Sequence, residues 1–271
     1  VAFPGTPTEV PVAVGGPLTI LRHAPDGEVP LAPHLSITFS EAMVALTTQD
    51  AAAKTVPVRL VPEVPGQWRW LGTQTLIFEP TTRFPMATTF TAVVPAGTPS
   101  ASGTPLKEAV QWTFGTPPPT VVASGPGAPG NDVESQPVQP TIWFAFDQKM
   151  DPAALLPSIA VVARGVRSPL RLATAEEIAK VLGEGAYAAD RVVAVVPTSP
   201  LPLNEWASVT IAAGAPSAEG PRRTAAAVQW RFRTYGPLAV TDHRCGWNGC
   251  RPGDSFSVSF SNPLDPTTFD P

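Results

Sequence analysis

The stretch LSITFSEAM, Leu35–Met43, decides the fold because parts of it recur along the chain. Its first six residues alternate apolar and polar side chains, which is typical of a half-buried antiparallel strand. The element FSEAM, Phe39–Met43, returns as FDQKM, Phe146–Met150, and a third time as FSNPL, Phe260–Leu264. A strand end that recurs together with the turn that follows it predicts a repeated β-unit.

Other segments repeat in the same order and at nearly constant spacing. VPAGTPSASG, Val94–Gly103, returns as IAAGAPSAEG, Ile211–Gly220. VQWTFGT, Val110–Thr116, returns as VQWRFRT, Val228–Thr234. Short alternating runs bounded by glycine or proline connect these segments, and turn signals at this spacing are expected of a β-sandwich.

The repeat divides the chain into a lead segment and three units. The expected bounds are 1–16 for the lead segment, 17–117 for unit 1, 118–235 for unit 2 and 236–271 for the start of unit 3. Unit 3 would hold only its first two strands. We therefore expect the chain to be a piece of a longer protein that stops inside a domain.

Helices are expected to be few and short. One helical insertion is expected in unit 2 near 174–183, where Thr174 and Glu177 have the spacing of a capping box. The turn DPAALL, Asp151–Leu156, offers an aspartate cap followed by proline at the first helical position. DPTTF, Asp265–Phe269, repeats that pattern in unit 3.

Composition excludes several classes of protein. Only 15% of the 271 residues are charged, the net charge is −4, and the basic residues form no cluster beyond Arg222 and Arg223. We therefore expect no nucleic-acid partner and no binding to anionic lipid. No apolar stretch approaches the ~18 residues of a transmembrane helix. The first residues lack the basic region of a signal peptide, so we expect that any export signal has been removed.

The two cysteines, Cys245 and Cys250, flank a glycine- and asparagine-containing turn in CGWNGC. We expect them to form a disulfide, which would place the protein outside the cytoplasm. A zinc site of both cysteines and His243, with Asp242 or Asp254 as fourth ligand, stays open, although paired zinc-ligand spacing is absent. Two free thiols are the third alternative.

No sequence motif of a known catalytic, cofactor-binding or metal-binding site is present, so we expect no enzyme and no cofactor. The histidines, which could be general bases but are expected to be exposed or structurally bonded, are His23, His34 and His243. Glu41 and Asp147, with Asn262 in unit 3, recur after the second strand of each unit. We expect a turn or cap role for them, because paired catalytic acids must face each other. Calcium at a domain junction stays an alternative.

Tryptophans offer the only other candidate contacts. Trp68 and Trp70 lie two residues apart on one face of an expected strand, so they could form a carbohydrate platform or a peptide contact, or be buried. Trp112 and Trp230 occupy equivalent positions in the repeat, which favours core packing. The methionines expected to fill the core are Met43, Met86 and Met150.

Taken together, these motifs resemble the N-terminal region of bacterial alpha-2-macroglobulins. The similar segments are LSITFSEAM, TQTLIFEPTTRFPMATTFTAVVPAGTPSASG, VQWTFGTPPP and the CGWNGC…FSVSFSNPLD block, in an order that covers nearly all of Leu18–Pro271. The FSEAM element alone also occurs in the broader bacterial Ig-like family of surface proteins. The resemblance implies an all-β fold of tandem Ig-like, macroglobulin-type β-sandwich domains, the third of them incomplete.

The resemblance also implies a function. The chain would be a non-catalytic N-terminal scaffold fragment of a broad-spectrum protease-trapping inhibitor, which closes around a protease that cuts its bait segment. Its partners would be other domains of the same polypeptide and, through the parent molecule, proteases. The parent would be periplasmic or in the cell envelope and lipid-anchored, with the anchor outside this fragment. Neither Cys245 nor Cys250 matches the family's thioester motif, Cys-x-Glu-Gln.

Two other hypotheses remain. The chain could consist of Ig-like modules of a surface or cell-wall protein that binds glycans or protein partners. It could also be an accessory region of a secreted enzyme. Residues beyond Pro271 would discriminate: a thioester motif, a wall anchor or a catalytic domain would each favour one hypothesis.

Overall fold

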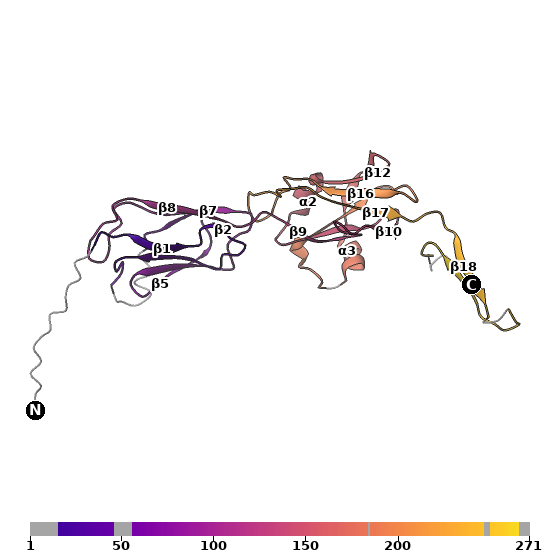
Figure 1. Cartoon of the computed structure of the whole chain (residues 1–271), viewed down its shortest axis with the longest axis horizontal. Coiled ribbons are helices and arrows are strands. Elements are labelled where there is room, and N and C mark those ends of the chain that lie inside the picture. Colours follow the sequence, from indigo (N-terminus) through magenta and orange to yellow (C-terminus); the bar gives the residue numbers. More distant parts are fainter. Residues whose placement is uncertain (1–15, 46–55, 184, 247–249, 266–271) are drawn as a thin grey trace, which may run out of the picture. The chain divides into compact units, whose positions relative to one another are not determined.

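The structure is a computed structural model that describes residues 16–45, 56–183, 185–246 and 250–265. Strands dominate it, and the chain divides into two compact parts, residues 1–117 and 118–271 (Figure 1). Most of the expected lead segment lies outside the described residues, so the structure does not test it.

Unit 1 is a sandwich of two four-stranded sheets with the strand orders β1-β3-β6-β5 and β2-β8-β7-β4. Neighbouring strands are antiparallel except for the parallel pair β2 and β8. The strands are β1 (Ile20–Ala24), β2 (Gly27–Glu28), β3 (Leu35–Phe39), β4 (Arg59–Val61), β5 (Gly66–Leu71), β6 (Thr75–Pro80), β7 (Thr89–Val94) and β8 (Val110–Gly115).

The core of unit 1 follows from the alternation of side chains along each strand. In β3, Leu35, Ile37 and Phe39 are fully buried, while the residues between them are partly exposed. Successive side chains point to opposite faces of a sheet, so one face of β3 meets the second sheet. There Phe84 packs edge-on against Phe90 and Phe114, with ring centroids 5.1 and 5.2 Å away.

Unit 2 repeats this plan with the sheets β14-β15-β11-β9 and β10-β17-β16-β12-β13, and again one parallel pair, β10 and β17. The strands are β9 (Val121–Gly125), β10 (Val133–Gln136), β11 (Ile142–Phe146), β12 (Ile159–Ala163), β13 (Val166–Arg167), β14 (Leu170–Leu172), β15 (Val192–Pro197), β16 (Trp206–Ile211) and β17 (Val228–Thr234). The helices are α2 (Pro152–Leu155), α3 (Ala175–Leu182) and the 3-10 turns η1 (Leu156–Ser158) and η2 (Ala189–Arg191).

The two expected helix starts in unit 2 are confirmed. The Asp151 carboxylate accepts hydrogen bonds from the backbone N–H groups of Ala153 and Ala154 at the start of α2. Thr174 and Glu177 form the reciprocal capping box of α3. This helix is inserted between β14 and β15, where unit 1 has only a tight turn between β5 and β6. The similar turn DPTTF, Asp265–Phe269, lies almost wholly outside the described residues.

A further strand pair follows unit 2: β18 (Val240–Cys245) and β19 (Phe256–Phe260) form a two-stranded sheet. Its pairing matches that of β1 with β3 and of β9 with β11, including a register irregularity after the first residue pair. Phe256, Val258 and Phe260 are 66%, 37% and 39% exposed. Their counterparts in β3 and β11 are at most 2% exposed. The assignment of this pair to a third unit stays a prediction.

Candidate functional site

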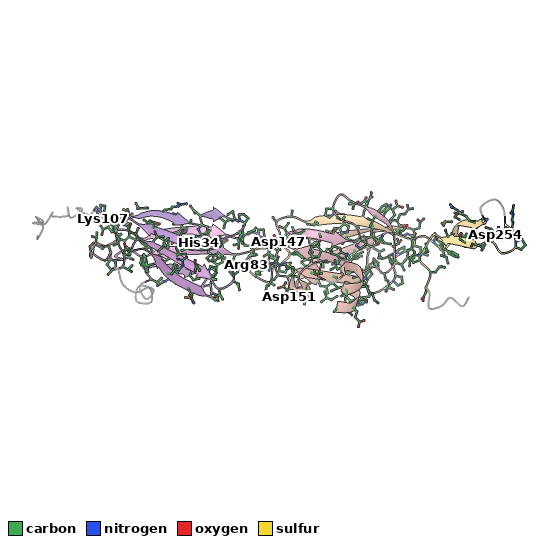
Figure 2. The ribbon with its side chains drawn as sticks, turned by 90° about the horizontal axis from the view of Figure 1, so that it is seen from below. His34, Arg83, Lys107, Asp147, Asp151 and Asp254 are labelled. Atoms are coloured by element: carbon green, nitrogen blue, oxygen red, sulfur yellow. A yellow bond between two sulfur atoms is a disulfide. The ribbon has the colours of Figure 1, made fainter. Side chains whose placement is uncertain are left out.

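The polar residues that recur after the second strand form a clamp between the first two strands of each unit. Asp147, which is labelled in Figure 2, accepts a hydrogen bond from the backbone N–H of Thr120, 3.0 Å away, through Oδ1. Its own N–H donates to the Thr120 carbonyl. The same reciprocal pair joins Ser40 to Thr19 in unit 1 and Ser261 to Ala239 in β18–β19. The expected turn role of Asp147 is therefore confirmed.

The expected equivalence of Glu41 and Asp147 is wrong by one position, because the structural counterpart of Asp147 is Ser40. Glu41 instead accepts a hydrogen bond from the Ser102 hydroxyl at 2.9 Å. Hydrogen bonds from Ser100 and then Ser102 lower the pKa of the Glu41 carboxyl. Glu41 thus ties the FSEAM turn to the PSASG loop. In unit 2 the residue at the same position, Gln148, accepts a hydrogen bond from the Ser217 hydroxyl at 3.0 Å, so the same two segments are bonded in both units.

Trp112 and Trp230 are core residues, as expected, with a further role that the sequence did not indicate. The Trp112 Nε1–H donates to the Pro25 carbonyl at 3.1 Å. The Trp230 Nε1–H donates to the Pro126 carbonyl at 3.0 Å. In both units the last strand is thereby bonded to the residue that follows the first strand.

Trp68 and Trp70 do share a face of β5, but that face points into the protein. They pair across the strands with Phe78 and Leu76, both in the core of unit 1. Trp70 is 5% exposed, and Trp68 is half-buried with its ring centroid 4.9 Å from that of Phe78. Burial is confirmed for Trp70, so the two rings do not form a joint carbohydrate platform. Trp68 stays partly exposed in the wall of a surface hollow of about 330 Å³.

The methionines expected in the core, Met43, Met86 and Met150, are all buried. Of the three histidines, His23 stacks on Trp112 with ring centroids 4.5 Å apart. His243 lies within β18, and the side chain of His34 is exposed. No catalytic role emerges for these histidines from the geometry of the described residues.

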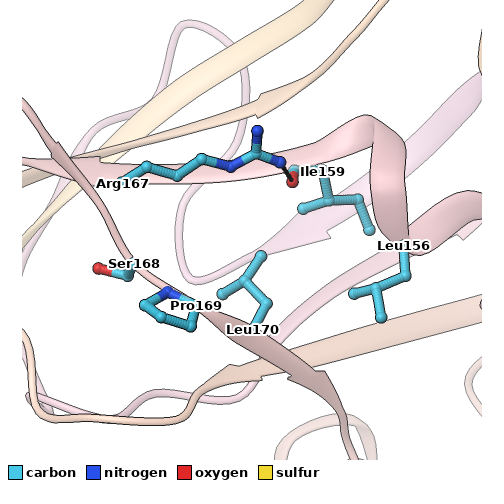
Figure 3. A pocket seen from close by; sticks show the side chains of 6 residues that line it. All are labelled: Leu156, Ile159, Arg167, Ser168, Pro169 and Leu170. Carbon is cyan, nitrogen blue, oxygen red and sulfur yellow. Dashed lines mark hydrogen bonds between the residues drawn. The ribbon is translucent and has the colours of Figure 1, made fainter.

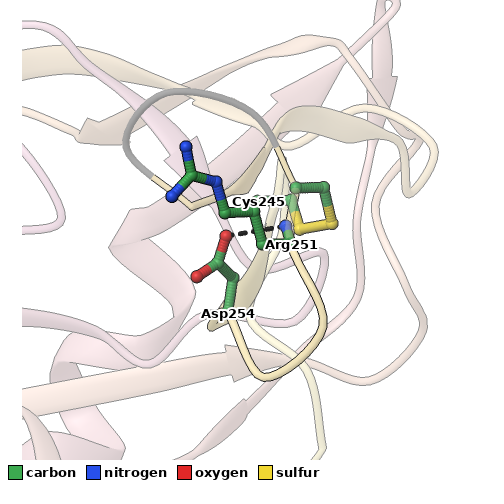
Figure 4. The surroundings of a disulfide bond; sticks show 4 residues. Cys245, Arg251 and Asp254 are labelled. Carbon is green, nitrogen blue, oxygen red and sulfur yellow. Dashed lines mark hydrogen bonds between the residues drawn. A yellow bond between two sulfur atoms is a disulfide. The ribbon is translucent and has the colours of Figure 1, made fainter.

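The structure joins Cys245 and Cys250 by a disulfide, with their Cα atoms 4.9 Å apart. Figure 4 shows the turn beside it, which the Arg251 N–H closes by donating to the Asp254 carboxylate at 2.7 Å. With both sulfurs in the disulfide, the alternative zinc site has no thiolate ligands. Within the described part of the chain, His, Cys, Asp and Glu side chains nowhere gather in threes that could hold a metal ion.

Several charged side chains form ion pairs with each other at the surface. Arg69 binds Glu79 and Arg231 binds Asp132, each at 2.6 Å. Exposed pairs of this kind contribute about 0–1 kcal/mol each. Glu177 is bound by Arg171 and by the backbone of Thr174, which together lower the pKa of its carboxyl to about 2. These carboxylates hold strands and a helix end in place.

A hollow of about 320 Å³ lies where the chain passes from β13 in one sheet to β14 in the other. Figure 3 shows its wall, which is formed mainly by Leu156, Ile159, Pro169 and Leu170. Arg167 lies beside it and donates to the Ile159 carbonyl at 2.9 Å. This wall offers apolar surface but no paired acid, base or nucleophile.

Another hollow, of about 300 Å³, has Trp143 in its wall, and this ring belongs to an aromatic pair that the sequence did not indicate. The Trp143 ring lies at its wall, and the Tyr187 ring centroid is 6.0 Å from that of Trp143. Tyr187 lies in the segment between α3 and β15, so only the fold brings the two rings together. The available sequence signal was the insertion itself, which has no counterpart in unit 1.

In the described residues, no helix is long and apolar enough to cross a membrane. The polar side chains described above hydrogen-bond strands, turns and helix ends to one another. This arrangement leaves open surface hollows and, in the described residues, no group of side chains arranged for catalysis.

Comparison with known proteins gives one family. A model described as a bacterial Ig-like domain matches the chain twice, over residues 17–116 and 115–234. No curated protein matches the sequence.

Three solved structures illustrate what the chain is similar to. An L,D-transpeptidase from Mycobacterium tuberculosis H37Rv is 17% identical, with 58% of this chain and 59% of that chain covered and a TM-score of 0.26. A segment of native alpha-2-macroglobulin from Escherichia coli that spans its domains MG0-NIE-MG1 is 12% identical, with 85% of this chain and 75% of that segment covered and a TM-score of 0.28. A mutated three-Ig segment of titin is 9% identical, with 84% and 70% covered and a TM-score of 0.26. The chain thus spans less than two thirds of the length of the transpeptidase.

Proposed function

The chain belongs to the bacterial Ig-like domain family, and from this premise we propose that it is a non-catalytic scaffold within a protein of the bacterial envelope or exterior. Ig-like domains are typical of extracellular and envelope proteins. One observation carries the proposal: the polar residues that recur in the repeat, such as Ser40, Asp147 and Ser261, are used to clamp strands. A disulfide is compatible with an oxidising compartment.

The specific proposal is the N-terminal scaffold of an alpha-2-macroglobulin-like inhibitor that traps a broad range of proteases. The sequence resemblance over Leu18–Pro271 supports it. A trap needs stiff modules connected by joints of limited freedom. The segment GTPPPT, Gly115–Thr120, has the composition of such a joint, because consecutive prolines hold a chain extended.

The proposal includes a third Ig-like unit that begins with β18 and β19. Its support is the shared register and the third copy of the clamp, Ser261 with Ala239. In this assignment the apolar face of β19 packs on later strands of the same unit, as β3 and β11 do in theirs. The partners of the chain would be other domains of the same polypeptide and, through it, proteases.

The native size of the protein tests this proposal. Antibodies raised against this chain are applied to envelope fractions of the source bacterium before and after addition of trypsin. We expect a band far above the 28.4 kDa of this chain, which moves to new conjugates after trypsin. Trypsin inactivated beforehand at its catalytic serine is the control and must leave the band in place. A band near 28.4 kDa contradicts the proposal.

A second candidate function is that of a surface module that binds glycans or protein partners. The hollow beside Trp143 favours it, because neither this ring nor the insertion beside it has a counterpart in unit 1. The two functions are compatible in one protein.

A further inference from the structure

The hollow at Trp143 has the composition of a small-molecule site. Besides the Trp143 ring, its wall includes Pro126, Pro137, Pro140 and Val181 of helix α3. The remaining wall residues, Gln136 and Thr141, bring an amide and a hydroxyl group. Ligand pockets typically combine a mostly apolar wall with a few polar groups, in volumes of about 300–1,000 Å³.

The Trp143 ring is seated by a glycine on the neighbouring strand. Trp143 in β11 is paired with Gly125 in β9, and Gly125 is buried. A Cβ atom at Gly125 would collide with Nε1, Cε2 and Cζ2 of the indole. Because glycine has no side chain, the Trp143 ring has room to pack with its Nε1 edge against Gly125 of β9.

Unit 2 alone carries this arrangement. The residue of unit 1 that occupies the position of Trp143 is Ser36, which is paired with Ala24. Unit 1 also lacks the helical insertion that supplies Val181 and leads to Tyr187. Val181 and Tyr187 are 44% and 41% exposed, so the insertion places apolar surface beside the ring without enclosing it. Unit 1 forms its sandwich without these features, so the shared fold does not require them.

We propose that this hollow binds a neutral saccharide, with a sugar ring stacked on Trp143. The C–H groups of a pyranose present a positive surface to the negative face of an aromatic ring. Its hydroxyl groups can bond to the Thr141 hydroxyl and donate to the Gln136 amide oxygen, while Nε2 of Gln136 donates to the Glu134 carbonyl at 2.9 Å. No charged residue contributes to the described wall, which disfavours an anionic sugar.

A proline-rich peptide suits the site less well. Peptides of that class dock in aromatic-lined grooves. In such a groove the indole N–H is the natural donor for a peptide carbonyl, whereas here the Nε1 edge of Trp143 lies against Gly125. The saccharide site does not depend on the protease-trapping proposal, and either can fail without the other.

The experiment is ¹⁹F NMR of the whole chain labelled with 5-fluorotryptophan. The Trp143 resonance is assigned by its loss in Trp143→Phe. The probes are chitotriose, maltotriose, cellotriose and decaproline, each titrated separately. A site that holds about one sugar ring is expected to bind with a Kd of about 1 mM. We expect at least one of the saccharides to shift the Trp143 resonance saturably.

Surface variants keep the test independent of folding. Tyr187→Ala and Val181→Lys alter exposed positions, and each is expected to weaken binding of the saccharide about tenfold. Gly125→Ala changes none of the wall residues themselves but displaces the Trp143 indole, and should weaken binding at least as much. Trp206→Phe is the control, because Trp206 lies in β16 of the other sheet; it should bind like the parent chain.

Three results would overturn the proposal. The first is the absence of any Trp143 shift with all three saccharides at about 10 mM, well above the expected Kd. The second is a shift that persists in both Tyr187→Ala and Val181→Lys. The third is a shift with decaproline alone, which would assign the hollow to a peptide.

Discussion

Replacing Trp230 by phenylalanine should destabilise unit 2 strongly, although the change conserves an aromatic ring. Trp230 is 4% exposed, and its Nε1–H donates to the Pro126 carbonyl at 3.0 Å. Phenylalanine has no donor, and a buried polar group left without its partner costs about 1–3 kcal/mol. The smaller ring also leaves a void of roughly 40 Å³, which costs about 1 kcal/mol at ~24 cal/mol per Å³. We expect a total loss of about 2–4 kcal/mol.

Differential scanning calorimetry and urea unfolding measure this loss. A change of this size in a domain of roughly 100 residues lowers Tm by about 10 °C or more. Trp206→Phe is the matched control. The Trp206 ring is half-buried and is stacked under the Arg231 guanidinium, which lies 4.5 Å from the ring centroid. Replacing this indole by phenylalanine should therefore lower the free energy of unfolding by less than about 1 kcal/mol. If Trp230→Phe lowers the free energy of unfolding no more than the control does, the hydrogen bond from Trp230 to Pro126 does not stabilise unit 2, and the reasoning is refuted.

Three further outcomes are expected. Phe84→Ala, which removes the centre of the aromatic core of unit 1, should cost about 3–5 kcal/mol in urea unfolding, and a loss under about 1 kcal/mol would contradict this packing. The folded-state pKa of Glu177 is about 2, below its ordinary 4.5, so its stabilising bond to Arg171 is fully present above pH 4.5 and lost as pH falls through about 2. In Glu177→Gln this acid-dependent part of the unfolding free energy should disappear, and an unchanged pH profile would count against it. Iodoacetamide should label neither Cys245 nor Cys250 in the denatured chain without reductant, and both after reduction; mass spectrometry showing labelling without reductant would exclude the disulfide.

The strands and the repeat were predictable because their determinants are local. Alternation in LSITFS decides which side chains of β3 can face a core, and the capping box at Thr174 is complete within four residues. The prediction that Glu41 is equivalent to Asp147 was wrong because both side chains are carboxylates and were paired for that reason. In the structure, Ser40 occupies the position of Asp147, and the two different side chains accept the same hydrogen bond.

Long-range contacts were beyond the reach of the sequence. The spacing of Trp68 and Trp70 shows that they share a face, but only the second sheet decides that this face is the inner one. The bond from Trp112 to Pro25 spans 87 residues. The hollow at Trp143 likewise depends on the position of the insertion over the sheet, which no local pattern encodes.

The chain is an array of Ig-like units, and the central proposal is that β18 and β19 begin a third. Amide hydrogen exchange of residues 256–260 tests it most directly, in this 271-residue chain and in the protein expressed from the complete reading frame. The account predicts fast exchange in this chain, because an isolated strand pair is marginally stable, and slow exchange in the longer protein, where later strands cover β19. Slow exchange in the monomeric 271-residue chain, or unchanged fast exchange in the longer protein, would contradict it.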